Sequence, residues 1–476
     1  MTTLSSTAFV FSRHEVIILA EREGLSIQAP SKPSLDVFLM WCDVLGASTG
    51  HDSIAATSGM PLTLHVFEKH KNGKRKLRNL VLNSSTANNG INQLEIDKWI
   101  HIIQYFADPL RDSTETMPTI DVIMQHPPKQ RKFFVLINPF GGTGKGEKIY
   151  DKIEHIMFHA NIQVEKMLTE HANHATEIAE HLDIHAYDAI VIIGGDGMVN
   201  EVIQGFMKRA DWSVAMQFPI GVIPGGTGNG LAKSLAVAAN EICTPENNMY
   251  LIAKGKTQEL DIATLRSESA VSYLVLSLTW GFMAEIDIES EKYRFFGSQR
   301  FFFGTLAKIL SSKEWTGKFS YLEASDESVP KYWDENPSIH PVDLLSPLGS
   351  PLPETWKTIE GPISMFWAMN VSHAADTANI APMAGLNDGY MYVILIQGKA
   401  TRAEYATVML GIEKGDHIKC DNVSVIKTRA FQLETPPDNI LSADGERWDG
   451  GICQVQVHRA MARILTIINK PESEQL

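Results

Sequence analysis

Residues 188–206 read Asp-Ala-Ile-Val-Ile-Ile-Gly-Gly-Asp-Gly-Met-Val-Asn-Glu-Val-Ile-Gln-Gly-Phe. The β-branched, apolar run Ala189–Ile193 predicts a strand that is buried on both faces of a parallel sheet. The two glycines that follow allow a sharp turn, and the apolar spacing of the remainder predicts a helix. Asp196 therefore lies at the carboxyl end of a strand, where open α/β sheets bind their ligands. The alternative is a tight strand-to-helix turn in which Asp196 serves only as the helix N-cap.

Two further units of the same kind flank this stretch. Phe133–Ile137 precedes Asn138-Pro-Phe-Gly-Gly-Thr-Gly-Lys-Gly, and Ile220–Ile223 precedes Pro224-Gly-Gly-Thr-Gly-Asn-Gly. A glycine-rich loop at a helix N-terminus attracts anions, because free N–H groups and the helix dipole face it. The first loop is not a P-loop, since Glu147 occupies the lysine position, and it does not match the Rossmann fingerprint. Three such units favour a nucleotide-phosphate site that is built from several loops at one sheet edge.

Composition excludes several classes of protein. A formal net charge of −14 argues against a nucleic-acid binder, which usually shows a basic face. The four cysteines (Cys42, Cys243, Cys420 and Cys453) lie far apart without metal-ligand spacing, which predicts a reducing intracellular compartment. No signal peptide is visible, and no apolar run approaches the ~20 residues that a bilayer span requires. We therefore expect a cytoplasmic protein that associates peripherally with intracellular or plasma membranes.

Residues 1–125 form a separate predicted module. Apolar strands at 62–67 and 77–82 flank Asn72-Gly73, which is a strong hairpin signal. Apolar spacing from Ile96 to Phe106 then predicts an amphipathic helix. Strands closed by one C-terminal helix resemble, weakly, a pleckstrin-homology-like (PH-like) module. We expect it to be regulatory.

A basic cluster surrounds the tip of this hairpin in an otherwise acidic chain. It comprises Lys69, Lys71, Lys74, Arg75, Lys76 and Arg78. At an anionic membrane surface such a cluster would gain ~1 kcal/mol per cation. A hairpin tip that is merely solvated explains the cluster equally well.

The second half of the chain predicts a β-rich domain. Residues 325–358 are rich in proline, serine and acids, so we expect an exposed insertion there. Alternating segments that follow it read as an antiparallel sandwich. Residues 300–310 read as a very apolar helix that could cover an acyl-chain pocket, where each buried methylene contributes ~0.8 kcal/mol. An ordinary core helix is the alternative.

Several motifs together resemble one family. Asn138-Pro-Phe-Gly-Gly, Gly194-Gly-Asp-Gly and Pro224-Gly-Gly-Thr-Gly-Asn are similar to elements of the diacylglycerol-kinase-like catalytic family. Residues 277–294, Ser-Leu-Thr-Trp-Gly-Phe-Met-Ala-Glu-Ile-Asp-Ile-Glu-Ser-Glu-Lys-Tyr-Arg, resemble the signature segment of sphingosine (long-chain-base) kinases almost residue for residue. The resemblance covers roughly residues 130–310 and 360–460.

The resemblance implies a role for each matching position. Asp196 would be the catalytic carboxylate that accepts the proton of the substrate hydroxyl, and Asp287 would recognise the amino-alcohol head of a sphingoid base. The other residues expected to bind the lipid are Ser277, Gly194, Gly195 and Gly197. The residues expected to bind ATP are Asn138, Pro139, Phe140, Thr169, Glu201, Gly226, Thr227, Gly228, Arg294, Arg300, Asp444, Gly445 and Glu446. Mg²⁺ is expected with ATP, but the sequence does not identify its ligands.

Two positions depart from the family pattern, and one assignment depends on the family alone. Phe140 stands where a basic residue is common, and Glu285 replaces an aspartate. Without the resemblance, Asp287 would read as a solvated acid in the alternating run Glu285-Ile-Asp-Ile-Glu, which places three acids on one face of a strand. With it, a buried ammonium would need Asp287 as its partner, because an unpaired buried charge is costly.

The predicted architecture has three parts. Residues 1–125 are the regulatory, PH-like α+β module. Residues 130–270 are an ATP-binding α/β domain with a Rossmann-like parallel sheet, and residues 271–465 are an antiparallel β-sandwich that binds the lipid and carries the insertion 325–358. Catalysis is expected in the cleft between the last two.

The predicted activity is ATP-dependent phosphorylation of the primary hydroxyl of sphingosine, dihydrosphingosine or phytosphingosine. A diacylglycerol or ceramide kinase is the alternative enzyme, and a non-catalytic lipid-binding scaffold is the alternative of another class. A pyridine-nucleotide kinase would leave the Phe-rich segment at 300–310 unexplained. An anionic membrane surface is an expected partner, a homodimer is possible, and nucleic acid is not expected.

Overall fold

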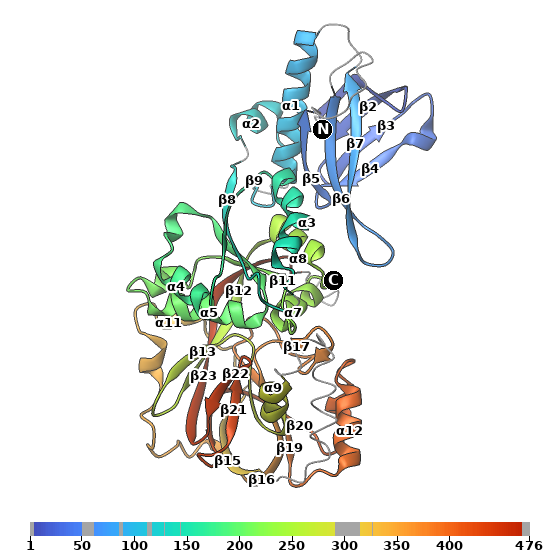
Figure 1. The fold of residues 1–476 in the computed structure, drawn as a ribbon. Helices are drawn as coiled ribbons and strands as arrows, with labels where there is room; N and C mark the ends of the chain where they lie inside the picture. The colour runs from blue at the N-terminus through green and yellow to red at the C-terminus, as the bar shows by residue number, and fades with distance from the viewer. Residues whose placement is uncertain are drawn as a thin grey trace. The chain divides into compact units, whose positions relative to one another are not determined.

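The computed structural model describes residues 4–49, 61–84, 89–111, 117–127, 129–142, 144–290, 315–325 and 327–468 (Figure 1). The chain divides into two compact units. Unit 1 comprises Met1–Phe133, Asp151–Glu165 and Thr244–Lys256. Unit 2 comprises Phe134–Tyr150, Lys166–Cys243 and Thr257–Leu476.

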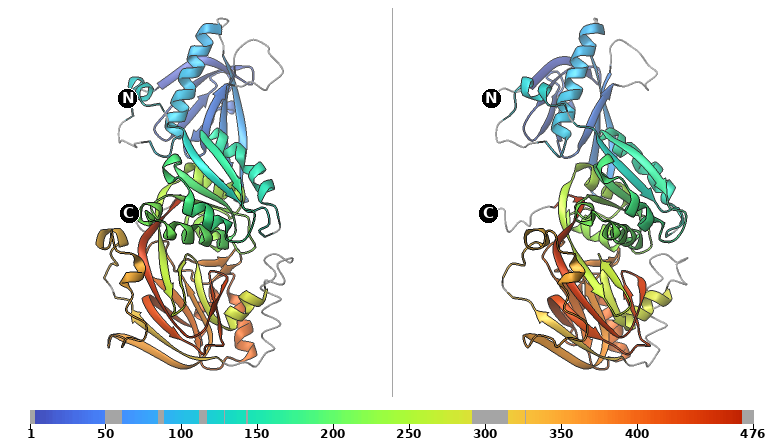
Figure 2. Two further views of the ribbon diagram at one scale, coloured as in Figure 1. Left: turned by 60° about the vertical axis from the view of Figure 1, so that its left-hand side comes forward. Right: turned by 90° about the vertical axis from the view of Figure 1, so that its left-hand side faces the viewer.

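Unit 1 contains a seven-stranded antiparallel sheet in the order β4-β3-β2-β1-β7-β6-β5. Helix α1 runs along this sheet in both views of Figure 2. The strands and helices are β1 (Leu4–Phe11), β2 (His14–Ala20), β3 (Gly24–Gln28), η1 (Pro33–Leu35), β4 (Val37–Met40), β5 (Val44–Thr49), β6 (Pro61–Lys69), β7 (Arg75–Ser84), α1 (Asn89–Ala107) and α2 (Ile120–Gln125).

The predicted amphipathic helix of this module is α1. Its residues Ile96, Trp99 and Ile103 are fully buried against the sheet, as the helical spacing requires. Phe106, one turn further on, stacks on Trp41 with ring centroids 4.8 Å apart. The predicted hairpin is β6–β7, whose pairs run from Pro61↔Asn83 to Lys69↔Arg75.

One member of the basic cluster differs from its prediction. Arg75 is buried, with its guanidinium 2.7 Å from the Asp43 carboxylate and 3.5 Å from the centroid of the Tyr250 ring. Its backbone N–H donates to Asn247. Because burial of an arginine requires such partners, Arg75 supports the interior of unit 1 instead of the surface. Lys71, Lys74 and Lys76 are exposed.

Most residues of the larger sheet belong to unit 2. Its strand order is β22-β21-β14-β16-β15-β20-β23-β11-β10-β8-β9, with β12 paired to β13 and β23, and β19 paired to β16 and β20. The strands are β8 (Arg131–Ile137), β9 (Ile162–Leu168), β10 (Ala189–Gly194), β11 (Ile220–Pro224), β12 (Lys256–Arg266), β13 (Val271–Leu274), β14 (Ser277–Gly281), β15 (Thr316–Glu323), β16 (Trp356–Met369), β17 (His373–Ala375), β18 (Ala378–Asn379), β19 (Met391–Gln397), β20 (Ser424–Glu434), β21 (Ile440–Ala443), β22 (Glu446–Asp449) and β23 (Ile452–Thr466).

The parallel sheet expected around residues 130–270 is confirmed only in part. β10 pairs in parallel with β11 from Ile190↔Ile220 to Gly194↔Pro224, and β11 pairs in parallel with β23 through Ile220↔Ile464. The pairs of β14, β15, β16, β19 and β20 are antiparallel, as a C-terminal sandwich requires. A Rossmann-like sheet is therefore not confirmed as a whole.

The remaining helices follow the strands. They are α3 (Gly146–His159), α4 (His174–His181), η2 (Ile184–Ala186), α5 (Asp196–Lys208), α6 (Trp212–Ala215), α7 (Gly230–Ala238), α8 (Pro245–Lys254), α9 (Phe282–Ser290), α11 (Tyr332–Glu335), η4 (Pro341–Leu344), α12 (Arg402–Gly411) and η5 (Asp416–Lys419). Among the described residues, no helix is long and apolar enough to cross a membrane.

Two hydrophobic cores hold unit 2 together. One surrounds β10 and β11 and includes Ile192, Val202 and Val222. The other fills the β-sandwich, where the rings of Phe319, Phe366 and Phe431 meet edge to face with centroids 5.1–5.8 Å apart. These cores fix the strand ends, and with them the loops described below.

The insertion expected at 325–358 is not exposed throughout. Tyr332 is buried at 3% exposure, and the indole N–H of Trp333 donates to the Met461 carbonyl at 3.0 Å. The aromatic rings of α11 explain the difference. Exposing two large rings to water costs more free energy than the hydration of the neighbouring polar residues provides.

Candidate active site

Three glycine-rich loops meet in unit 2. The in-register pairing of β10 and β11 brings their carboxyl ends side by side, and the loop after β8 lies against them. A Cβ placed on Gly226 would lie 2.4 Å from the Gly195 Cα, and one on Gly142 would lie 2.7 Å from the Gly225 carbonyl oxygen. Backbone therefore packs on backbone, which only glycine permits. The sequence predicted this gathering of loops from three separate turns.

Asp196 occupies the first turn of α5, directly after this contact. Its side chain accepts hydrogen bonds from the backbone N–H groups of Gly230 (2.7 Å) and Leu231 (3.0 Å), the first residues of α7. Burial raises the pKa of this carboxyl group to about 6, against the two hydrogen bonds, which lower it. Asp196 is therefore not the N-cap of its own helix; it caps a neighbouring one and remains mostly ionised at neutral pH.

The loop Gly225–Gly230 is closed by its own asparagine. Asn229 adopts a left-handed conformation with φ 58°, and its side-chain amide accepts from the Gly226 N–H (2.8 Å) and donates to the Gly226 carbonyl (2.9 Å). A Cβ on Gly228 would lie 3.1 Å from Asp196 Oδ2. In contrast, a Cβ on Gly197 would meet nothing within 4 Å, so open space adjoins the first turn of α5.

A group of side chains that the sequence motifs did not indicate flanks this loop. The Lys233 ammonium lies 3.3 Å from the Asp376 carboxylate, and the Asp376 N–H donates to the Gly228 carbonyl at 3.1 Å. His373, whose pKa is lowered to about 4 mainly by burial, starts the short strand β17 beside them. The sequence did hold one signal for this group: Lys233 lies one turn into the helix that follows the glycine loop.

The residues after β8 shape the first loop. The Asn138 side-chain oxygen accepts from the N–H groups of Phe140 (2.9 Å) and Gly141 (2.7 Å), which is an Asx turn. Phe140 itself is 76% exposed, with Pro139 between it and Asn138. Asn138 thus acts on the loop backbone, and Phe140 presents an aromatic ring to solvent.

Thr169 and Glu201 both stabilise neighbouring backbone. Thr169 is buried, and its N–H donates to the Ile137 carbonyl at 2.9 Å. The Glu201 carboxylate accepts from the Ala175 N–H at 3.1 Å, so it caps α4, whose own N-cap residue makes no side-chain hydrogen bond. Burial raises the pKa of Glu201, and the nearby Glu446 carboxylate also raises it.

The carboxylate of Asp444 is surrounded by hydrogen-bond donors, three of them backbone N–H groups. Its carboxylate accepts from the N–H groups of Val275, Leu276 and Ser277 and from the Asn200 amide, at 2.7–2.9 Å. Burial raises its pKa against these bonds. Gly445 follows with φ +91°, so the turn between β21 and β22 is held in place. This turn fixes the start of β14, where Ser277 is buried.

Three predicted residues fall wholly or partly outside the described residues. Asp287 lies in α9, but its side chain is not described. Arg294, Arg300 and the apolar segment 300–310 lie outside the described residues altogether. The alternation at Glu285-Ile-Asp-Ile-Glu is not a strand, because α9 spans Phe282–Ser290. The expectation that Asp287 lies on one face of a strand is therefore wrong.

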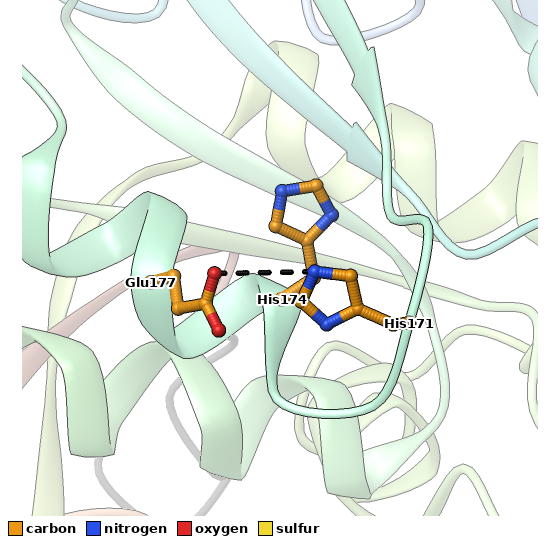
Figure 3. Close-up of side chains that lie close together, drawn as sticks. All are labelled: His171, His174 and Glu177. Atoms are coloured by element: carbon orange, nitrogen blue, oxygen red, sulfur yellow. Dashed lines mark ion pairs between the residues drawn. The ribbon is translucent and has the colours of Figure 1, made fainter.

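Two exposed side chains and a half-buried one near α4 resemble a metal site. His171, His174 and Glu177 each offer one ligand atom, and these atoms lie within 4.8 Å of one another (Figure 3). However, His174 Nδ1 accepts the Glu170 N–H at 2.9 Å, so its neutral ring carries the proton on Nε2 and offers no free lone pair there. The stacked pair of histidines, with centroids 4.5 Å apart, is better explained as part of the turn before α4.

Two family descriptions match the sequence of this chain. The family description "Diacylglycerol kinase catalytic domain" matches residues 132–265, and "YegS C-terminal NAD kinase beta sandwich-like domain" matches residues 358–467. Sphingosine kinase 1 of Homo sapiens is 33% identical over 347 residues, which are 70% of this chain and 90% of the human protein. The chain belongs to the sphingosine kinase family.

Other members and one solved structure agree. Sphingosine kinase 1 of Arabidopsis thaliana is 32% identical over 67% of this chain and 68% of its own length. Sphingoid long chain base kinase 4 of Schizosaccharomyces pombe is 28% identical over 69% of this chain and 73% of its own length. The crystal structure of a diacylglycerol kinase from Bacillus anthracis covers 71% of this chain and 97% of its own, with a TM-score of 0.50 and 15% identity, which shows the fold alone.

Proposed function

We propose that this chain transfers the γ-phosphoryl group of ATP to the primary hydroxyl of a sphingoid base. One observation carries the proposal: the Asp196 carboxylate borders the point where the three glycine loops meet. Phosphoryl transfer needs a positioned nucleophile and charge stabilisation more than covalent help. A carboxylate beside a phosphate-binding turn meets the first need, and the family membership identifies the substrate class.

Asp196 would act as the general base. It would accept the proton of the lipid hydroxyl as the oxygen attacks the γ-phosphorus, and the bond to the ADP oxygen breaks. The two α7 N–H groups hold the carboxylate in one orientation while leaving a lone pair on each oxygen. A pKa of about 6 keeps it ionised at pH 7 and close to the operating pH, where general bases are effective.

ATP would lie over the glycine loops. The turns at Gly226, Thr227 and Gly228 and the N-terminus of α5 would receive its phosphates, with Asn138, Pro139, Phe140, Thr169 and Glu201 around the nucleotide. Asp444, Gly445 and Glu446 would hold this side of the site, Asp444 by positioning β14. Arg294 and Arg300 would supply positive charge to the phosphates.

Mg²⁺ would fit this donor set. Mg²⁺ binds one or two carboxylates together with phosphate oxygens, and the Glu446 carboxylate is close enough to Glu201 to help raise the Glu201 pKa. Bound Mg²⁺ would neutralise charge that develops on the transferring phosphoryl group. Asp196 remains the proton acceptor.

The lipid would approach from the β-sandwich. Asp287 of α9 would pair with the ammonium, and Ser277 with Gly194, Gly195 and Gly197 would line the head-group end. The open space beside Gly197 leaves room for an approaching hydroxyl. A diacylglycerol carries no ammonium and would leave the Asp287 charge unpaired.

A lipid panel tests this proposal. Purified protein with radiolabelled ATP and Mg²⁺ is offered sphingosine, a ceramide and a diacylglycerol in matched micelles. We expect phosphate transfer to sphingosine, and its loss in Asp196→Asn at unchanged thermal stability. Transfer only to ceramide or diacylglycerol would replace the substrate assignment, and ATP-independent lipid binding without transfer would favour a scaffold.

The finer organisation is also proposed. Residues 1–125 would form the PH-like regulatory module, 130–270 the Rossmann-like ATP domain and 271–465 the lipid domain with its insertion at 325–358. The antiparallel sheet closed by α1 supports the first assignment. An anionic membrane would be the site of action, with peripheral attachment in the cytoplasm. A homodimer remains a prediction that light scattering would test.

A further inference from the structure

Two buried polar atoms of the β-sandwich lack hydrogen-bond partners within the described part of the chain. They are the hydroxyl oxygen of Thr279 and the indole nitrogen of Trp367, in side chains that are 3% and 9% exposed. Thr279 of β14 pairs directly with Trp367 of β16, so the two unsatisfied atoms belong to facing neighbours. Buried polar groups in native proteins nearly always have partners, and two facing exceptions call for a common one.

The pair lies on a defined face of the sheet. Alternation along β14 places Thr279 on the same face as Ser277, two residues closer to the loops. Ser442 of β21 pairs with Thr279 from the other side, so this row of residues is polar in an otherwise apolar core. Helix α9, which contains Asp287, begins directly after β14.

The chemistry of the pair selects its ligand. An indole N–H can only donate, whereas a threonine hydroxyl can both donate and accept. A neutral hydroxyl satisfies both at once, by accepting from Trp367 and donating to Thr279. An ammonium group could not accept from the indole, and a phosphate would bring an unpaired charge into the core. The site therefore fits a neutral acceptor on an apolar molecule, and the neutral acceptors that a sphingoid base carries are its hydroxyl groups.

We propose that Thr279 and Trp367 form a subsite for the 4-hydroxyl group of the lipid substrate, which lies beyond the 1- and 3-hydroxyl groups that all sphingoid bases share, and that the enzyme consequently prefers 4-hydroxylated sphingoid bases. This inference rests on the proposed function and on the assignment of Ser277 to the head-group end. Residues two apart on a strand are about 7 Å apart. The subsite therefore reads the lipid a few carbon atoms beyond its reacting hydroxyl.

The experiment compares phytosphingosine, which carries the 4-hydroxyl group, with sphinganine, which lacks it. Thr279→Val keeps the side-chain shape but removes the hydroxyl, and Trp367→Phe removes the indole N–H. Thr428→Val is the matched control, because the Thr428 hydroxyl donates to the Leu322 carbonyl at 2.7 Å. The kcat/KM for both lipids and the melting temperature are measured for each protein.

For wild type we expect a higher kcat/KM with phytosphingosine. In Thr279→Val and Trp367→Phe the ratio of the two kcat/KM values should fall about five- to tenfold, with sphinganine turnover changed less than twofold. Thr279→Val should melt at the wild-type temperature or higher, since it removes an unsatisfied group, whereas Thr428→Val should melt lower.

Three outcomes would overturn the inference. An unchanged ratio in both variants, at normal sphinganine turnover, would show that the pair binds no substrate hydroxyl. A melting temperature of Thr279→Val that falls as far as that of Thr428→Val would show a structural partner, such as a buried water, at this position. A wild-type enzyme that phosphorylates sphinganine but not phytosphingosine would refute the preference for 4-hydroxylated bases. Wild type that phosphorylates neither base would instead refute the proposed function itself.

Discussion

At the scale of single residues, two buried aspartates differ in how many hydrogen bonds they accept. Asp196 accepts two backbone hydrogen bonds and faces the glycine loops, so its carboxylate keeps capacity for a substrate proton. Asp444 accepts four hydrogen bonds and has its capacity filled. The number of donors around each carboxylate supports the proposed roles, Asp196 as the base and Asp444 as a positioning residue.

The raised pKa of Asp196 predicts the acid limb of the pH profile. A base must be deprotonated to accept a proton, so activity should be lost as pH falls through the pKa of about 6 and should level off above pH 7. The measurement is kcat/KM for sphingosine between pH 5 and 8, since this parameter reports the free enzyme. A profile that stays flat down to pH 5 would contradict the role of Asp196 as base.

Replacement of Asp444 should act on stability. Asp444→Asn removes acceptors from backbone N–H groups that remain buried, so we expect a loss of about 2–4 kcal/mol in the free energy of unfolding. Urea denaturation measures it. The control is Asp449→Asn on the adjacent strand β22, where the aspartate side chain is 82% exposed and should contribute almost nothing. Equal effects of the two substitutions would refute the positioning role.

At the scale of elements, the loops between strands and helices form the site. Parallel pairing of β10 and β11 brings two strand ends together, and glycine lets their turns touch. The two kinds of glycine differ: Gly226 is packed against backbone, whereas Gly197 borders open space.

Because Gly226 is packed and Gly197 is not, replacement by alanine should have different effects at the two positions. Gly226→Ala would place a methyl group 2.4 Å from the Gly195 Cα, so it should lower the melting temperature and weaken ATP binding. The methyl group of Gly197→Ala would meet no atom beyond its own helix turn within 4 Å among the described residues, and it sits in a helix, where alanine gains up to ~1 kcal/mol over glycine. It should therefore keep or raise stability while it slows phosphate transfer. Calorimetry and the lipid kinase assay measure the two. Full activity of Gly197→Ala would remove Gly197 from the substrate-binding residues.

The same elements show what the sequence could predict. The strand–glycine–helix units follow from local patterns, so β10, α5 and the three loops were predicted from residues 133–230. The helix cap that Asp196 provides to Gly230 was not predicted, because that contact joins residues from different units of the pattern. Nor was α9: its alternating acids mimic a strand, and only the surrounding fold selects the helix.

At the scale of the whole molecule, each compact unit has its own chemistry. Unit 2 holds the glycine loops, and unit 1 holds the basic hairpin. Arg75 shows why charge counted along a sequence misleads: its partners Asp43 and Tyr250 come from distant segments, and they take it into the interior. The other five cations of the cluster (Lys69, Lys71, Lys74, Lys76 and Arg78) are exposed, and Arg78 forms an ion pair with Glu68.

The exposed lysines and the buried Arg75 of this hairpin should therefore respond differently to substitution. Lys74→Glu with Lys76→Glu should weaken binding to phosphatidylserine vesicles by at least about 2 kcal/mol, or roughly thirtyfold, because each surface cation contributes ~1 kcal/mol. The melting temperature should not change. Lys32→Glu with Lys414→Glu, at two exposed positions elsewhere, alters net charge equally and should leave vesicle binding nearly intact.

Arg75→Met should behave in the opposite way. Asp43 would lose its partner and the Tyr250 ring its cation, so unit 1 should lose stability, while the exposed lysines still attract the vesicle. Co-sedimentation across a salt series, read beside thermal melts, separates the two effects, since surface attraction weakens as salt screens it. If both pairs of charge reversals reduced binding to the same extent, net charge alone would explain it and the hairpin would not be the docking element.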